Sequence, residues 1–262
     1  NIKCEGGALN QHEEINVFAI KKGVREKVGK LMLYKNNDIP KLELNFIDVI
    51  SDNNSLVKPS SYEYYLKFKS YNQALIRAEK RLEAKFDLLD LAKTNEDVAD
   101  FLAEVASNKQ LDIDYLANRF VNLFDKYGGK YRPIDDQKYL NINDDGHTRT
   151  YIFYTNISAG NVNGYAPSRM EGRRMKWGNA IVVFKQAHTR LDVLVHEIGH
   201  SLGLPHVFEK NNNKFVFYQG QSGNLMDYTW FYAKSKQVDS KITRTYFSKF
   251  QWDILRSDRS LK

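Results

Sequence analysis

The sequence predicts an α+β fold built around a mixed, twisted β-sheet. Short runs of β-branched and aromatic residues occupy the first fifty residues and return after residue 149, and amphipathic helical segments fill most of the interval between them. Runs of this kind, bounded by turn residues, are typical of strands, whereas apolar residues three and four apart favour helices. The chain has 262 residues, of which 42% are hydrophobic, so it can bury the core of one large domain.

The N-terminal part is predicted to be β. Residues 15–20 and 28–34 form two apolar runs that are separated by a turn at Lys22-Gly23, and residues 42–50 form a third. Pro40 marks a boundary between the second run and the third. We therefore expect a short β segment over residues 1–38 and a larger domain over residues 39–262.

The region from residue 61 to residue 127 is predicted to be mostly helical. Residues 86–91 are ambiguous between strand and helix. Three stretches carry apolar residues on one helical face, and the last of them stops at a Gly-Gly pair: 61–76, 94–106 and 114–127.

Strands return in the C-terminal half of the chain. Residues 150–155 and 179–185 are β-rich, and the second of these runs leads into an apolar helical segment over residues 191–202. Residues 246–255 have the apolar periodicity of a closing helix.

Composition argues against nucleic-acid binding and against a membrane-spanning segment. The net charge is +7, but the densest basic stretch, residues 169–176, falls in an expected loop, and no nucleic-acid-binding motif accompanies it. No run approaches the roughly 18–20 apolar residues that a membrane span needs. We expect neither a nucleic-acid partner nor a membrane span.

The segment His196-Glu197-Ile198-Gly199-His200 carries the chemistry. Two histidines four residues apart on a helix lie about 40° apart around its axis, so both imidazoles can reach one ion. Glu197 faces the same cleft, where its carboxylate can take a proton from an activated water as a general base.

His206 completes the predicted ligand set. Gly203 permits the sharp turn that ends the helix, because glycine tolerates positive φ, and the chain can then double back. Three imidazoles leave a fourth position for water, which is typical of a catalytic Zn²⁺ site rather than a structural one. The metal ligands are therefore expected to be His196, His200 and His206.

The segment from His196 to His206 resembles the long zinc motif of the metzincin clan of metallopeptidases. The resemblance implies a metzincin-like catalytic domain, with an active-site helix and a methionine turn, that hydrolyses protein or peptide substrates. Asn224-Leu225-Met226-Asp227-Tyr228 occupies the place of that turn. By this likeness Met226 packs beneath the imidazoles, and Tyr228 contacts the metal or the reacting oxyanion.

Two further segments resemble parts of the same clan. Residues 179–185 are similar to the edge strand that runs antiparallel to bound substrate, which could bind an extended peptide by strand addition. Gly164-Tyr165-Ala166 is similar to the rim of the cleft.

A narrower likeness concerns pappalysin-type enzymes and the metallopeptidase domains of bacterial type VI, PAAR-like secreted effectors. It is carried by residues 202–208, 224–228 and 250–255 and, more loosely, by residues 44–49 and 72–76. This likeness implies a toxin that is secreted or delivered outside the producing bacterium, with a secretion apparatus and a cognate immunity protein as partners. Val207 departs from the clan, many of whose members have an acidic or small polar residue after the third histidine.

Alternative interpretations stay open at this point. The same metal and base could serve a zinc amidase that acts on peptidoglycan or another non-protein amide, and a binding module could keep the fold without the activity. Cys4, the only cysteine, excludes an intramolecular disulfide, and a flexible Cys4-Glu5-Gly6-Gly7 segment could reach the cleft and block the metal, as in some metzincin zymogens.

Overall fold

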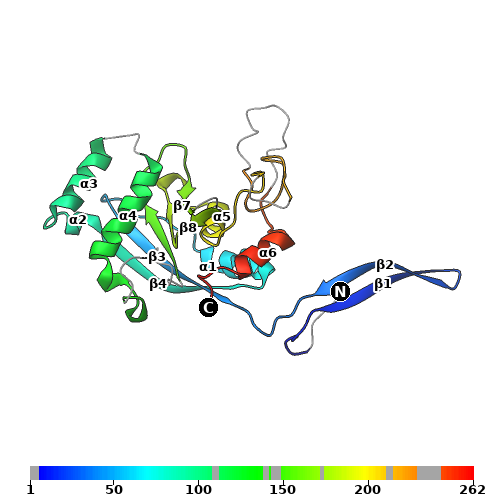
Figure 1. Cartoon of the computed structure of the whole chain (residues 1–262). Helices are drawn as coiled ribbons and strands as arrows, with labels where there is room; N and C mark the ends of the chain where they lie inside the picture. Colours follow the sequence, from blue (N-terminus) through cyan, green and yellow to red (C-terminus); the bar gives the residue numbers. More distant parts are fainter. Residues whose placement is uncertain are drawn as a thin grey trace. The chain divides into compact units, whose positions relative to one another are not determined.

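A computed structural model describes residues 6–107, 112–137, 142, 149–171, 174–210, 215–228 and 243–262. The chain forms two compact units, Asn1–Pro40 and Lys41–Lys262 (Figure 1). Cys4 lies outside the described residues, so its predicted inhibitory contact stays a prediction.

The first unit is a two-stranded antiparallel hairpin of β1 (Glu13–Lys21) and β2 (Val24–Leu33). Its turn consists of Lys22 and Gly23, which both have positive φ, at 49° and 81°. Two successive residues with positive φ fit the right-handed twist of the flanking strands. The two strands expected here are confirmed.

The second unit is built on a five-stranded sheet in the order β4-β3-β5-β9-β6. The parallel part consists of the first four of these strands, and β6 pairs antiparallel with β9, which confirms the mixed sheet of an α+β fold. The strands have these bounds: β3 Lys41–Ile50, β4 Arg77–Asp87, β5 Thr150–Thr155, β6 Gly164–Tyr165 and β9 Ala180–Val183.

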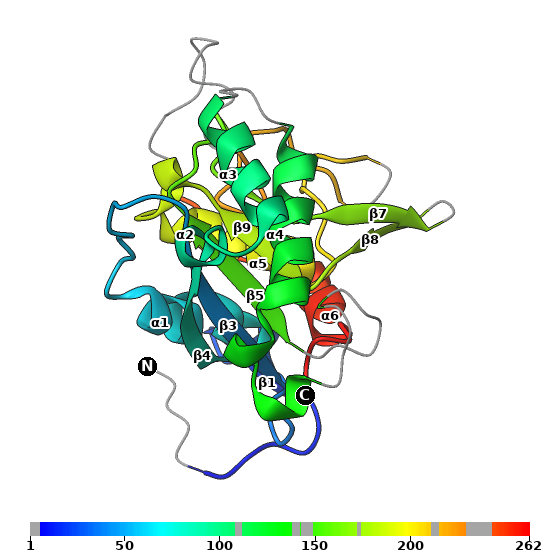
Figure 2. The same cartoon turned by 90° about the vertical axis from the view of Figure 1, so that its left-hand side faces the viewer.

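A hydrophobic core lies on each face of the sheet, because successive strand side chains point to opposite faces. On β5, Ile152 and Tyr154 join the core formed with α5 (Leu191–Ser201), whereas Phe153 joins the opposite core. Figure 2 shows α3 and α4 lying over this second face of the sheet. The helices there are α2 Leu88–Leu91, α3 Glu96–Ser107 and α4 Ile113–Tyr127.

The prediction of mostly helical structure between residues 61 and 127 was wrong for β4. Arg77–Asp87 is rich in Lys, Arg, Glu and Ala, which are good helix formers. Its apolar side chains nevertheless alternate, and the strand lies at the edge of the sheet, where charged residues are common because they discourage pairing with other chains. Pairing with β3 therefore outweighs the local helix propensity.

The helix expected over residues 61–76 is present as three short helical pieces. These are α1 (Tyr62–Tyr65), a π-helical turn over Leu66–Ser70 and a 3₁₀ turn over Tyr71–Ala74. The segment ends at Leu75, which has a positive φ of 54°.

The expectation that residues 179–185 form the edge strand was also wrong. β9 lies between β5 and β6, and its residues Val182 and Val183 pair with Tyr165 and Gly164. The edge of the sheet is the two-residue strand β6, which is too short and too glycine-rich to give a strand pattern in the sequence.

The remaining elements connect and close this unit. The basic stretch expected to be a loop contains a hairpin of β7 (Ser168–Glu171) and β8 (Arg174–Trp177). The closing helix is α6 (Lys249–Arg256), and a capping box at Ser248 and Gln251 begins it. No described helix is long and apolar enough to cross a membrane.

Candidate metal centre and active site

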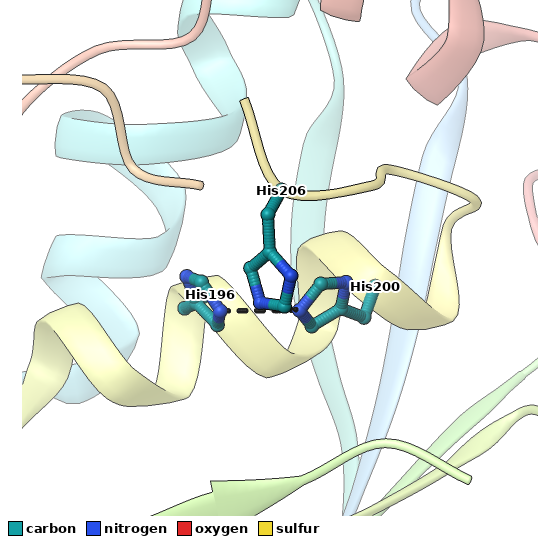
Figure 3. A group of neighbouring side chains, drawn as sticks. All are labelled: His196, His200 and His206. Atoms are coloured by element: carbon teal, nitrogen blue, oxygen red, sulfur yellow. Dashed lines mark hydrogen bonds between the residues drawn. The ribbon is translucent and has the colours of Figure 1, made fainter. Parts of the chain in front are cut away.

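α5 positions the first two predicted ligands. Its apolar side chains, among them Val195 and Ile198, are buried in the core beside β9. This packing fixes the helix against the sheet and leaves His196 and His200 on the face toward the third histidine (Figure 3). Helix α5 ends at Ser201, and the predicted turn follows at Gly203, whose φ is +87°. Leu204 N–H donates to the Gly199 carbonyl across this turn at 3.0 Å.

The three histidines converge on one point. His200 Nε2 lies 3.1 Å from His196 Nε2 and 3.1 Å from His206 Nε2 (Figure 3). A tetrahedral Zn²⁺ with bonds of about 2.0–2.1 Å holds its nitrogen ligands about 3.3–3.4 Å apart. The structure therefore brings the predicted ligand set together at the spacing that one metal ion requires.

The other ring nitrogens fix the protonation of these imidazoles. His196 Nδ1 lies 2.8 Å from the Leu225 carbonyl, and His200 Nδ1 lies 2.7 Å from the Leu204 carbonyl. His206 Nδ1 lies 2.6 Å from Glu209 Oε1. Carbonyl and carboxylate oxygens accept hydrogen bonds, so each Nδ1 carries the proton, and in a neutral ring Nε2 then carries the lone pair.

Burial keeps the first two rings neutral. It lowers the pKa of His196 well below its ordinary value and, with the charge of His206, lowers the pKa of His200 to about 3. Nitrogen lone pairs that face one another at 3.1 Å cannot hydrogen-bond to each other. A bound cation would satisfy all of them, so the residues fit a metal ion.

Met226 lies where the methionine turn was expected, against the ligand helix. It is fully buried, and a Cβ atom built on Gly199 would lie 2.6 Å from Met226 Sδ. Gly199 stands between the two helical ligands, so its missing side chain lets the thioether approach the backbone there. The turn is fixed by Asn224 Oδ1, which accepts from Met226 N at 2.9 Å.

Glu197 is buried and lines the same cavity as His196. Its side chain packs on Gly164, because a Cβ atom there would meet Glu197 Cγ at 2.6 Å and Oε1 at 3.0 Å. Burial raises the pKa of Glu197 to about 8, although the positive charge of Arg244 opposes this rise. The cleft rim predicted at Gly164 thus lies directly over the predicted base.

Tyr228 contacts the metal-site histidines. Its ring centroid lies 4.6 Å from that of His206 and 5.7 Å from that of His196. Burial raises the pKa of its hydroxyl to about 12, so the phenol stays protonated at neutral pH.

Sequence reasoning missed several residues of the site. Glu209 binds His206, and Phe208 stacks on the same ring with centroids 4.9 Å apart and planes inclined by 7°. Arg190 and Arg244 line a cavity of about 180 Å³ together with His196 and Glu197. The i,i+3 spacing of His206 and Glu209 was a usable signal, but nothing in the sequence links Arg244 to α5.

Part of the chain matches the model of a known protein family. Residues 143–251, somewhat under half of the chain, match the Peptidase M66 family. The matched region contains the three histidines, Glu197, Met226 and Tyr228. No curated protein matches the chain.

Among solved structures, the chain is similar to metalloproteinase-II from Bacteroides fragilis, at 17% identity and a TM-score of 0.45. The similarity covers 84% of this chain and 54% of that one, so the chain spans about half the length of that protein.

The match to a peptidase family thus covers the segment in which three imidazole nitrogens converge on one metal position. These two observations show that the chain is similar to metallopeptidases over the segment that forms its candidate metal site.

Proposed function

We propose that the protein is a zinc-dependent endopeptidase of the metzincin type in which Glu197 is the general base. The observation that carries the proposal is the convergence of three Nε2 atoms on one point, with Glu197 lining the same cavity as His196. Three imidazole nitrogens and an open position suit Zn²⁺ in a hydrolytic site.

His196, His200 and His206 would hold the ion. When bound, the dication polarises the scissile carbonyl and lowers the pKa of water at the site toward neutrality.

Glu197 then moves the proton. Without a metal its buried carboxyl has a pKa of about 8, and a neighbouring dication favours its ionised form because opposite charges attract. The carboxylate accepts a proton from the attacking water and returns it to the leaving amine, as general acid–base catalysis requires.

Tyr228 is proposed to stabilise the oxyanion. It lines the same cavity as His196 and Glu197, and its protonated hydroxyl can donate a hydrogen bond to the carbonyl oxygen as negative charge develops there.

β6 is proposed to bind the substrate backbone. One side of this strand pairs with β9, and among the described strands it forms the end of the sheet. Because Gly164 packs on Glu197, a peptide that pairs with β6 would pass directly beside the general base.

The test is turnover with matched variants. The zinc-loaded protein should cleave a mixed peptide library, a chelator should abolish cleavage, and added Zn²⁺ should restore it. Glu197→Gln should bind zinc as the parent does and lose at least about 100-fold in kcat. Equal cleavage by Glu197→Gln would remove the assigned base, and digestion of purified peptidoglycan without peptide cleavage would favour the amidase.

We also propose that the enzyme acts outside the cell that makes it. Support comes from the resemblance of residues 202–208, 224–228 and 250–255 to pappalysin-type and effector domains. Fractionation of a producing culture, with the protein detected by antibody, tests this: recovery only from the cell interior would contradict it.

A further inference from the structure

The cavity beside the metal centre has a positively charged wall. It holds about 180 Å³ and is lined in part by His196 and Glu197 of the candidate site. The other lining residues come from α5 and the segment before it, from the stretch that leads into β6, and from either side of residues 229–242: Arg190, Val193, Asn161, Val162, Asn163, Gly164, Tyr228 and Arg244.

Two guanidinium groups share one carboxylate in this wall. Arg190 Nη2 lies 2.8 Å from Asp192 Oδ2, and Arg244 Nη2 contacts the same oxygen. Arg244 Nη1 also donates to the Asp227 carbonyl at 2.9 Å, which is a neutral group. Asp192 can balance only one of the two arginines, so these three side chains keep one positive charge.

Arg244 retains a donor after these contacts. Only 5% of its side chain is exposed, and its Nε has no hydrogen-bond partner among the residues that the structure describes. A buried N–H group without a partner is costly. Arg190 is more accessible, because 36% of its side chain is exposed, and it lines the cavity.

Among the described lining residues, Glu197 is the only one with a carboxylate. In the zinc-loaded enzyme it would lie beside a dication whose charge outweighs its own. Val193 is the apolar lining residue that α5 contributes, so it can contact the methylene groups of a side chain whose head reaches the arginines.

We propose that this cavity is a specificity pocket for an acidic side chain, Asp or Glu, of a substrate residue that flanks the scissile bond. The inference rests on the proposed peptidase function and names its substrate class. Arginine is suited to binding carboxylates because its planar N–H groups match their geometry. A lysine in the same place would meet like charge, and a neutral side chain would leave the guanidinium donors unpaired.

The first experiment is a cleavage profile of a peptide library that is randomised around the cut. We expect Asp and Glu to be enriched at one of the two flanking positions. Glu should be preferred over its isostere Gln by at least about tenfold in kcat/KM, since a site built to bind a charged group rejects analogues that lack the charge. A profile without acidic enrichment at either position would overturn the proposal.

Variants of the accessible arginine test the cause. Arg190→Gln should reduce the Glu-over-Gln ratio to a few-fold at most, and Arg190→Glu should shift the preference toward Lys. Lys249→Gln removes a partly exposed charge on α6, which is paired with Asp253, and should keep the parent ratio. Metal content and circular dichroism show whether each variant is folded, and an Arg190→Gln protein that is folded and keeps the full ratio would contradict the assignment.

A binding measurement separates this inference from the proposed function. Zinc-loaded Glu197→Gln protein is immobilised, and retention of pools of blocked peptides that carry Glu, Gln or Lys is compared. Preferential retention of the Glu pool supports the pocket even if the parent protein cleaves nothing, in which case only the peptidase proposal fails. Cleavage or retention that ignores the acidic residue overturns the pocket and leaves the peptidase proposal standing.

Discussion

At the scale of single residues, the geometry of the metal site depends on the group that accepts a hydrogen bond from Nδ1 of each imidazole. Backbone carbonyls of Leu225 and Leu204 orient His196 and His200, whereas a carboxylate, Glu209, orients His206. A carboxylate increases the basicity of the ring it binds and fixes its tautomer. His206 follows the end of α5 and lacks the support of a helix, so Glu209 has the most to contribute to that ligand.

Replacement of Glu209 should weaken metal binding. In Glu209→Ala the His206 ring loses its orienting hydrogen bond, and we expect zinc affinity to fall about 10- to 100-fold. Competition with a fluorescent zinc chelator measures the change. Glu96→Ala, which removes an exposed carboxylate at the start of α3, should leave affinity at the parent value; if both variants bind zinc equally well, Glu209 has no such role.

Even the smallest side chain at position 164 should reduce turnover. A methyl group there would lie 2.6 Å from Glu197 Cγ, so Gly164→Ala must displace the proposed base. A displacement of about 1 Å can cost about 100-fold in rate, with metal content unchanged. Gly129→Ala, where a Cβ atom meets nothing within 4 Å, is the matched control. Parent-like turnover by Gly164→Ala would show that the base is placed in another way.

The sequence predicted these residues unevenly, for a physical reason. His196, His200 and His206 could be found because one helix and one turn set their spacing. Glu209 lies near enough in sequence to share that logic. Arg244 comes to α5 only through tertiary packing, 52 residues from its partner Asp192, and no local pattern reports such a contact.

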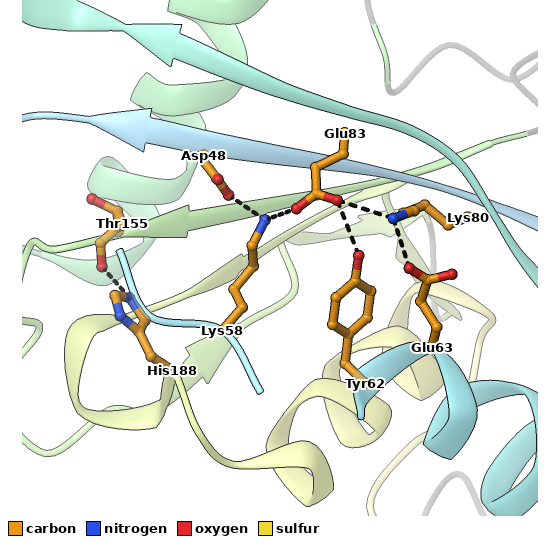
Figure 4. A network of polar contacts seen from close by, with 8 residues as sticks. All are labelled: Asp48, Lys58, Tyr62, Glu63, Lys80, Glu83, Thr155 and His188. Carbon is orange, nitrogen blue, oxygen red and sulfur yellow. Dashed lines mark hydrogen bonds and ion pairs between the residues drawn. The ribbon is translucent and has the colours of Figure 1, made fainter. Parts of the chain in front are cut away.

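At the scale of elements, a polar network joins the segment that leads into α1 to strands β3 and β4 (Figure 4). Lys58 Nζ lies 2.7 Å from Asp48 on β3 and 2.5 Å from Glu83 on β4. Lys80 Nζ also lies 3.0 Å from Glu83. The network holds the crossover between two parallel strands, which helps to explain why a sequence of helix formers is held as β4.

Because of this network, the free energy of unfolding should depend on pH in the acidic range. Burial opposes ionisation of Glu83, but the hydrogen bonds from Lys58 and Lys80 prevail and lower its pKa from 4.5 to about 2. The unfolded chain binds this proton first, so the stabilisation is present above pH 4.5 and is lost as the pH falls toward about 2.

Urea unfolding at several acidic pH values measures this effect. Glu83→Gln should be less stable than the parent above pH 4.5, and the difference should shrink toward about pH 2. An equal difference at every pH would mean that the charge of Glu83 contributes nothing. Glu96→Gln, at an exposed position, is the control.

Elements with a clear period were predicted well, and those set by their neighbours were not. β3 and β5 are buried strands with obvious patterns, and α4 begins at an Asp112 cap. β6 is only Gly164–Tyr165, and its place at the edge depends on pairing with β9. A two-residue strand has no period, so its place in the sheet could not be read from the sequence.

At the scale of the whole molecule, the two units differ in the core and site residues that they contain. The unit Lys41–Lys262 contains both hydrophobic cores and all residues of the proposed site, whereas Asn1–Pro40 contributes a hairpin with largely exposed side chains. A two-stranded hairpin is marginally stable by itself. The unit Lys41–Lys262 should therefore fold without it.

A chain that starts at Lys41 tests this division. It should bind one zinc per molecule with the parent affinity and keep the parent circular dichroism in the helical region, because no core residue is removed. The comparison is made by elemental analysis and thermal unfolding. Loss of metal binding or of the folding transition would show that the hairpin is part of the catalytic fold.

The central claim is that three imidazoles hold one catalytic metal ion, and X-ray absorption at the zinc edge of the reconstituted protein tests it most directly. We predict four-coordinate zinc with three nitrogen ligands at about 2.0–2.1 Å and one oxygen, and loss of that site in His200→Ala. A six-coordinate, oxygen-rich spectrum, or the same spectrum from His200→Ala, would contradict the account.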